Sequence, residues 1–247
     1  MNGYGRGLFG LPPVVKNIIL INVLMLLAYF TVRSVYGTDL NHVLGLYFPA
    51  SEHFRPFQII THMFMHGGIT HLFFNMFALY MFGQVLEQVW GPKRFFIYYI
   101  ICGLGAALTH EAVIGIQYNK IMNIISPDQL QMVLDEGSQT FNMGKVFADD
   151  TMKDLQLLLN VPTVGASGAV FGVLLAFGVL FPNTQLMLLF PPIPMKAKYF
   201  VLMYGALELY LAFSQPGSNI AHAAHLGGML FGYLLIRYWR KTTTTLF

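Results

Sequence analysis

The chain has 247 residues, of which 55% are apolar and only 10% are charged, and its formal net charge is +3. Soluble chains carry roughly 25% charged residues, so this composition excludes an ordinary soluble domain, and it is too apolar for a disordered chain. A single cysteine, Cys102, excludes a disulfide scaffold, and no basic stripe indicates a nucleic-acid partner.

Six apolar segments predict an all-α, polytopic membrane helix bundle in a lipid bilayer. A membrane-spanning helix needs about 20 mainly apolar residues. The expected spans cover residues 14–36, 69–88, 95–116, 165–181, 199–213 and 220–236. Together they predict one membrane domain over residues 14–238, with short tails at 1–13 and 239–247. No cleavage site follows the first span, so we expect no cleaved signal peptide.

Lysine and arginine residues predict the orientation of the spans. With the N-terminus inside, the inner segments hold nine of the 14 basic residues and the outer segments hold five. Positive charge gathers on the cytoplasmic side of membrane proteins, so both termini are expected in the cytoplasm. Short tails without a targeting segment favour a bacterial inner membrane.

Two long outer segments separate the spans. Residues 37–68 are rich in aromatic and histidine residues, which favours a position in the outer interface. Residues 117–160 are more polar. Within them, Ser126 and Gln129 form a capping-box pattern that predicts a short helix ending near Gly137, and residues 152–159 are a second candidate helix.

Polar residues in three of the spans are predicted to lie at one depth. Counted from the inner ends at ~1.5 Å per residue, Ser167 lies about 21 Å up, His225 and Asn75 about 18 Å, and His71 about 24 Å. In a hydrocarbon core ~30 Å thick, all four fall in one layer, roughly 6–12 Å below the outer surface. Polar side chains are costly there, so this coincidence predicts a functional site.

The residue types in this layer indicate nucleophilic catalysis. A serine hydroxyl needs an adjacent base, and the imidazole of His225 suits that role for Ser167. If a helix begins near Ser167, its first N–H groups face a developing oxyanion. Gly228 and Gly232 form a small-residue face that we expect to pack the sixth span on the fourth.

Ordered motifs within these spans resemble the rhomboid family of intramembrane serine proteases. The resemblance covers nearly the whole chain, from the first span to the sixth. The matching residues are His66, His71 and Asn75 (H-x-x-x-x-H-x-x-x-N); Gly83, Glu87, Gly91 and Phe95 (G-x-x-x-E-x-x-x-G-x-x-x-F); Gly165, Ser167 and Gly168 (G-x-S-G); and His225, Gly228 and Gly232 (H-x-x-G-x-x-x-G).

The resemblance implies a Ser–His dyad with Ser167 as nucleophile and His225 as base. It assigns the oxyanion hole to the Ser167 backbone N–H with His71 and Asn75, and it implies that Phe171 packs on His225. It also implies cleavage of membrane-spanning protein substrates, with water reaching the site from the outer face. We expect no cofactor, metal or nucleic-acid partner.

Some residues depart from the family pattern. The Trp–Arg pair common in the first outer loop is replaced by Phe57 and Gln58. Glu208, about ten residues into the fifth span, matches no motif; a place at a substrate gate, a histidine partner and a structural hydrogen bond all remain open for it. The acidic segment 117–160 has no assigned role.

Two other functions compete with proteolysis. The pairs His62/His66 and His222/His225 have ligand-like spacing, which is compatible with a metal-dependent membrane enzyme. A non-catalytic relative that binds membrane clients is the second alternative, although such relatives usually lose the serine or the histidine. A transporter is the least favoured, because no two-fold repeat is present.

Overall fold

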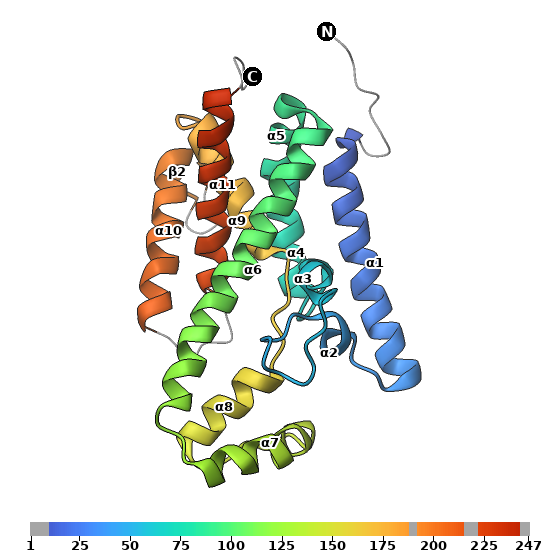
Figure 1. Ribbon diagram of the computed structural model, residues 1–247. Coiled ribbons are helices and arrows are strands. Elements are labelled where there is room, and N and C mark those ends of the chain that lie inside the picture. Colours follow the sequence, from blue (N-terminus) through green and yellow to red (C-terminus); the bar gives the residue numbers. More distant parts are fainter. Residues whose placement is uncertain (1–9, 188–191, 215–221, 243–247) are drawn as a thin grey trace.

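The computed structural model describes residues 10–187, 192–214 and 222–242, and these form a bundle of helices with one small β-hairpin (Figure 1). Among the described residues, three helical stretches are long and apolar enough to cross a membrane. They are α1 (Pro13–Tyr36), the stretch Ile69–Trp90, and α6 (Pro92–Met122). Leucines of α1 such as Leu20, Leu24 and Leu27 are more than half exposed, as expected for side chains that face lipid.

The remaining helices lie close to the predicted spans. The stretch Ile69–Trp90 is made of α4 (Ile69–Ala78), the π-helical segment η3 (Leu79–Gly83) and α5 (Gln84–Trp90). The later spans correspond to α9 (Ser167–Leu180), α10 (Ala197–Ser214) and α11 (His222–Thr242). The start of the sixth predicted span, residues 220–221, lies outside the described residues. In Figure 1, α1 begins and α11 ends at the same end of the bundle.

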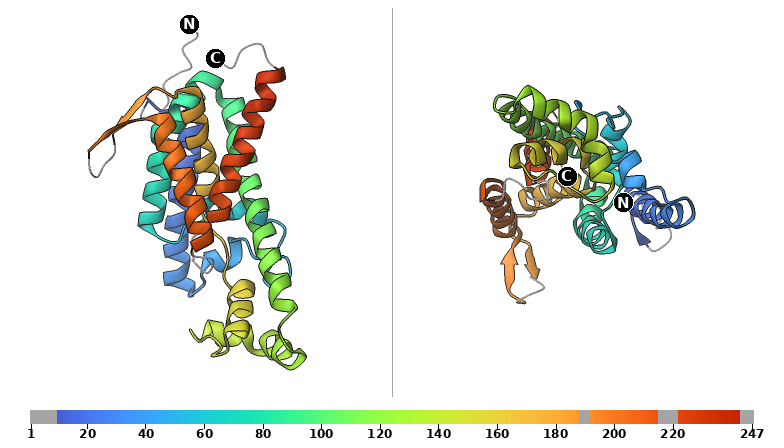
Figure 2. Two further views of the ribbon diagram at one scale, coloured as in Figure 1. Left: turned by 90° about the vertical axis from the view of Figure 1, so that its left-hand side faces the viewer. Right: turned by 90° about the horizontal axis from the view of Figure 1, so that it is seen from below.

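The helix α9 is short and central. Its 14 residues are almost all apolar, and most are buried against α6, α10 and α11 (Figure 2). A helix that is apolar all round belongs in the interior of a bundle. At 1.5 Å per residue it is only about 21 Å long, so its first residue, Ser167, lies well inside the bundle and not at its outer end.

Glycines bring α11 close to its neighbours. A Cβ on Gly228 would lie 1.8 Å from the carbonyl oxygen of Gly168, so α9 and α11 touch backbone to backbone, as predicted. Gly232 differs from the prediction. A Cβ there would lie 2.3 Å from the hydroxyl of Tyr98, which places this glycine against α6 and not against α9.

The short helical elements lie toward the end of the bundle opposite the start of α1 (Figure 1). They are α2 (Leu40–Leu44), α3 (Gln58–Thr61), η2 (His62–Phe64), α7 (Pro127–Asn142) and α8 (Asp150–Asn160). The capping box predicted at Ser126 and Gln129 is present. The helix it starts does not end at Gly137, however. Gln156 of α8 donates a hydrogen bond to the Gly137 carbonyl (2.8 Å), and this packing keeps the glycine inside the helix.

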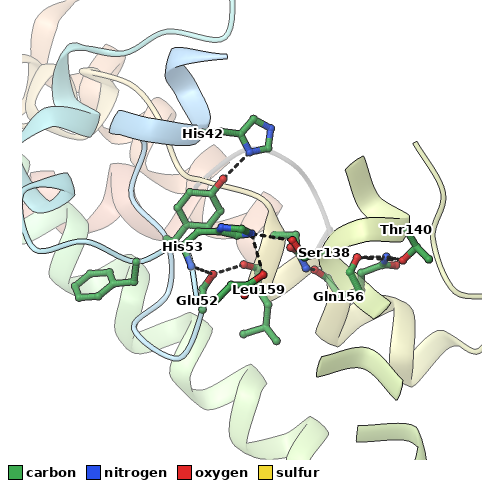
Figure 3. A network of polar contacts seen from close by, with 12 residues as sticks. His42, Glu52, His53, Ser138, Thr140, Gln156 and Leu159 are labelled. Atoms are coloured by element: carbon green, nitrogen blue, oxygen red, sulfur yellow. Dashed lines mark hydrogen bonds and ion pairs between the residues drawn. The ribbon is translucent and has the colours of Figure 1, made fainter. Parts of the chain in front are cut away.

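Polar contacts join the outer segments to one another (Figure 3). The ring of His53 hydrogen-bonds the Ser138 hydroxyl of α7 at 3.1 Å, and Gln156 donates to the Thr140 hydroxyl at 2.7 Å. The carbonyl of Leu159 accepts a hydrogen bond from the Ser51 hydroxyl. Because these contacts link α7, α8 and the segment before α3, residues 37–68 and 117–160 are joined to each other at one end of the bundle.

A β-hairpin at the opposite end was not predicted. Strands β1 (Gln185–Met187) and β2 (Pro194–Lys196) pair antiparallel and project from the side of the bundle (Figure 2). Each strand has only three residues, which is too short for an alternating apolar pattern to be recognised in the sequence. Helix α6, which corresponds to the third expected span, also extends beyond its expected end at residue 116, as far as Met122.

Glu87 stabilises the start of the first helix. Its carboxylate oxygens accept hydrogen bonds from the backbone N–H groups of Val14 and Val15, at 2.9 and 2.7 Å. These N–H groups have no partner within α1, because the first turn of a helix leaves its donors free. The carboxylate therefore ties α5 to the beginning of α1.

We expect Glu87→Ala to lower the free energy of unfolding by about 1–3 kcal/mol, because a buried and a half-buried N–H group lose their acceptor. Glu87→Gln, which keeps one acceptor oxygen, should lose less. Thermal unfolding in detergent micelles measures both, with the exposed Glu136→Ala of α7 as control. Equal stability of Glu87→Ala and this control would contradict the capping role.

Candidate active site

The extended segment 163–165 leads into the bundle interior, where Ser167 lies. Thr163 and Leu46 exchange two backbone hydrogen bonds of 2.8 and 2.9 Å, and the Gly165 N–H donates to the His62 carbonyl at 2.9 Å. Gly165 has φ +134°, and a Cβ there would lie 2.9 Å from the His71 ring. Glycine is therefore required at this position by both backbone conformation and space, and α9 begins two residues later, at Ser167.

The structure brings Ser167 and His225 together. The Oγ atom of Ser167 lies 2.9 Å from Nε2 of His225, which is 8% exposed and sits on the first turn of α11. The Phe171 ring stacks on the His225 ring, with centroids 4.2 Å apart and planes 5° apart. This contact fixes the plane of the imidazole ring, and in the structure Nε2 lies on the serine side, where it can accept the hydroxyl proton.

Backbone N–H groups of the α9 start and the His71 ring lie close to Ser167. The first N–H groups of α9 have no partner within the helix and point out of its N-terminus. Nδ1 of His71 accepts a hydrogen bond from the Gly67 N–H at 3.3 Å, so a neutral His71 carries its proton on Nε2. That Nε2 atom would lie 3.1 Å from a Cβ on Gly165, beside the extended segment that leads to Ser167.

Asn75 lies one helical turn after His71 on α4 and is buried. One hydrogen of its amide group is bonded to the His71 carbonyl, with an Nδ2–O distance of 2.9 Å. An amide NH₂ has two donor hydrogens, so a second one is available. Asn75 thus both holds the His71 turn and offers a donor.

Glu208 has two histidine partners. Its Oε2 atom lies 2.6 Å from Nδ1 of His222 and 2.9 Å from Nδ1 of His225. All three side chains are buried between α10 and α11. Of the roles left open by the sequence, pairing with histidine is the one seen here. The spacing of His222 and His225 indicated that they share a face, but no motif linked them to Glu208.

A small cavity adjoins Ser167, and His225 is not among the residues that line it. Its volume is about 20 Å³, and its polar lining includes His62, His110, Thr163 and Ser167. A volume of that size holds one water molecule. His110, whose Nε2 lies 2.7 Å from the Thr163 hydroxyl, was not singled out in the sequence, because a lone histidine within an apolar helix carries no motif.

Among the described residues, no third possible ligand atom joins those of His62 and His66. Nδ1 of His62 hydrogen-bonds the Gln58 carbonyl at 2.9 Å, which is a structural contact. Burial, with the nearby His71 ring, lowers the pKa of His66 to about 4, so this ring is neutral at physiological pH. Within the described part of the chain, three possible ligand atoms for a metal meet only at Glu208, His222 and His225.

The family model and the known proteins that this chain resembles all belong to one family. The Rhomboid domain matches residues 53–242. The chain is 29% identical to Rhomboid protein 1, mitochondrial, of Saccharomyces cerevisiae, over 74% of this chain and 42% of that protein. It is 27% identical to Rhomboid protease AarA of Providencia stuartii, over 70% of this chain and 52% of that protein.

A third relative is Putative rhomboid protease YdcA of Bacillus subtilis, 27% identical over 72% of this chain and 64% of that protein. The chain thus spans between two fifths and two thirds of the length of these relatives. The match of the Rhomboid domain to most of the chain, together with its helical membrane bundle, shows that this protein belongs to the rhomboid family.

Proposed function

We propose that this protein is an intramembrane serine endopeptidase that cleaves transmembrane-helix substrates within or near the membrane. The observation that carries the proposal is the 2.9 Å separation between the Ser167 hydroxyl and Nε2 of His225 inside a membrane bundle. A serine hydroxyl is a weak nucleophile until a base takes its proton, so an adjacent base is the chemical requirement for attack.

The proposed reaction passes each proton through one imidazole, that of His225. Nε2 of His225 takes the proton of Ser167 as Oγ bonds to the scissile carbonyl carbon, and the resulting oxyanion is held by the α9 N-terminus with His71 and Asn75. His225 then gives the proton to the leaving amine as the peptide C–N bond breaks. Water, deprotonated by the same imidazole, hydrolyses the acyl-enzyme and restores Ser167.

The proposed substrates are single-span membrane proteins whose helices contain small or helix-breaking residues. Such residues let a helix unwind, which a protease needs because a helical peptide bond is shielded by its own turn. Cleavage of a panel of single-span proteins by the native chain and by Ser167→Ala tests the proposal. A substrate cut by the native chain alone supports it. Binding without cleavage by either chain would instead indicate a client-binding protein.

The proposed topology has six spans within one domain at residues 14–238, with both termini cytoplasmic and the site opening outward. It is supported by the basic residues of the inner segments and by the position of α7 and α8 at the end opposite the hairpin (Figure 1). We propose a bacterial inner membrane as its location, and two of the three relatives named above are bacterial.

Cysteine labelling tests this orientation. Gln139→Cys in α7 and Asn183→Cys before β1 both occupy exposed positions, whereas the native Cys102 is buried. On intact cells, a membrane-impermeant maleimide should label Gln139→Cys but not Asn183→Cys, and permeabilised cells should show both. If only Asn183→Cys were labelled on intact cells, the orientation of the chain in the membrane would be the opposite of the one proposed.

A metal-dependent membrane enzyme is the second candidate, favoured by the donor set of Glu208, His222 and His225. One carboxylate and two imidazoles are ligands suited to a divalent transition metal. If the serine mechanism holds, cleavage persists after dialysis against a chelator, with much less than one metal ion per chain by elemental analysis. Loss of cleavage on chelation, with recovery on adding Zn²⁺, would favour the metal enzyme.

A further inference from the structure

The side of His225 that faces away from Ser167 meets a buried carboxylate. Nε2 of His225 lies 2.9 Å from the Ser167 hydroxyl, and Nδ1 of the same ring lies 2.9 Å from Oε2 of Glu208. The three groups come from α9, α11 and α10 and are joined in the order hydroxyl, imidazole, carboxylate. Glu208 is 7% exposed.

A carboxylate at this place has a defined chemical effect. A neutral imidazole can take the serine proton at Nε2 only if its own proton resides on Nδ1. An acceptor beside Nδ1 favours that tautomer, and its negative charge stabilises the imidazolium that forms when the serine is deprotonated. In this structure Nδ1 is close to the carboxylate but not well aligned for a hydrogen bond, a geometry common before substrate binds.

Burial of Glu208 in a membrane protein calls for an explanation. An acidic side chain in a transmembrane helix is rare and is tolerated when it is paired. The imidazole of His222 supplies one partner at 2.6 Å and that of His225 supplies the other. A purely structural link between α10 and α11 needs only His222, whereas the contact with His225 reaches the reacting atoms.

We propose that Glu208 is a positioning residue of the active site, so that Ser167, His225 and Glu208 act as a triad. This inference rests on the proposed function above. The other groups close to His225 are the Phe171 ring, which stacks on it, and the His222 ring, 6.3 Å away. His71 and His110 interact with it electrostatically. Glu208 is thus the acidic group that these contacts place beside His225.

The test compares Glu208→Gln and Glu208→Asp with the native chain on a single-span substrate. We expect Glu208→Gln to lower kcat roughly 10- to 100-fold with little change in KM, because the substrate does not touch Glu208. Glu208→Asp, which keeps the charge, should recover part of the rate. Without the carboxylate the imidazolium is less stable, so the acidic limb of the pH–rate profile should move to lower pH in Glu208→Gln.

Two further variants separate positioning from folding. Glu111→Gln makes the same change at a half-buried glutamate of α6, whose two buried carboxylate oxygens have no hydrogen-bond partner among the described residues, so its kcat should equal that of the native chain. His222→Ala removes the structural partner but leaves Glu208 beside His225, so its kcat should fall less than that of Glu208→Gln.

The outcomes distinguish the triad from the proposed function. If the native chain cleaves and Ser167→Ala does not, but Glu208→Gln keeps the native kcat and pH profile, only the triad is wrong. Equal loss in Glu208→Gln and His222→Ala, with equal loss of thermal stability, would reduce Glu208 to a structural link. If native and Ser167→Ala chains are equally active, the proposed function itself fails.

Discussion

Replacing Ser167 by alanine is expected to abolish cleavage, and replacing His225 by alanine is expected to do the same. Each change should lower the rate by at least about 10³-fold, because neither the hydroxyl nor the base works without the other. The 2.9 Å contact between Oγ and Nε2 makes them one unit. The double variant should therefore be no slower than either single variant.

The measurement is the initial rate on a single-span substrate in detergent or lipid vesicles. Ser167→Ala should change thermal unfolding little, because it removes a single oxygen atom. His225→Ala removes a buried ring that stacks on Phe171, so a lower unfolding temperature is expected for it, and its rate is measured below that temperature. Ser34→Ala, at an exposed position on α1, is a matched control and should keep the native rate. If the His225→Ala chain retained more than a tenth of the native rate, His225 could not be the base.

Gly228→Ala is expected to separate the two reacting groups. Its Cβ would lie 1.8 Å from the Gly168 carbonyl oxygen, and backbone atoms on a central helix cannot yield without moving the helix. A shift of about 1 Å between nucleophile and base costs on the order of 10²-fold in rate. Overpacking of this kind also destabilises by about 1–3 kcal/mol. We therefore expect a loss of at least ~10²-fold in cleavage, with a lower unfolding temperature.

A second glycine provides the control for this prediction. At Gly115 of α6, a Cβ would make only an ordinary contact of 3.8 Å with Phe48. Gly115→Ala should thus keep the native rate and gain slightly in stability, because alanine favours a helix more than glycine does. If Gly228→Ala cleaved as fast as Gly115→Ala, close contact between α9 and α11 would not be what positions the dyad.

The meeting of Ser167 and His225 could be predicted from the sequence because the rise of a helix is constant. Counting residues from each inner boundary placed both side chains in the same layer, and the structure brings them to 2.9 Å. The packing of Phe171 on the His225 ring was implied by the resemblance to the rhomboid family, and the structure shows the two rings stacked. Depth along a helix is thus readable from residue counts alone.

Rotation of one helix about its axis relative to another is not readable in that way. The face of α10 that carries Glu208 meets α11 only because of how the two helices pack, and no periodic pattern in the fifth span indicates this. For the same reason Gly232 was expected on α9 but faces Tyr98 of α6. Helix ends set by tertiary contacts, such as the one expected at Gly137, were also missed.

The start of α9 illustrates a local effect that sequence patterns only partly capture. A span was expected from residue 165, yet residues 163–165 are held extended by hydrogen bonds to Leu46 and His62. Those partners lie about 100 residues away in the chain, so their influence cannot be read from the local sequence. The result is functionally useful, because it frees the N–H groups of the helix start at Ser167.

Labelling of the folded chain with a fluorophosphonate, followed by mass spectrometry of the adduct, tests the central claim most directly. A phosphonyl group should attach to Ser167 alone, and the adduct should disappear in His225→Ala, because only a serine with an adjacent base attacks phosphorus readily. Cleavage by a chain that forms no adduct at Ser167, or an adduct formed equally well in His225→Ala, would contradict the claim.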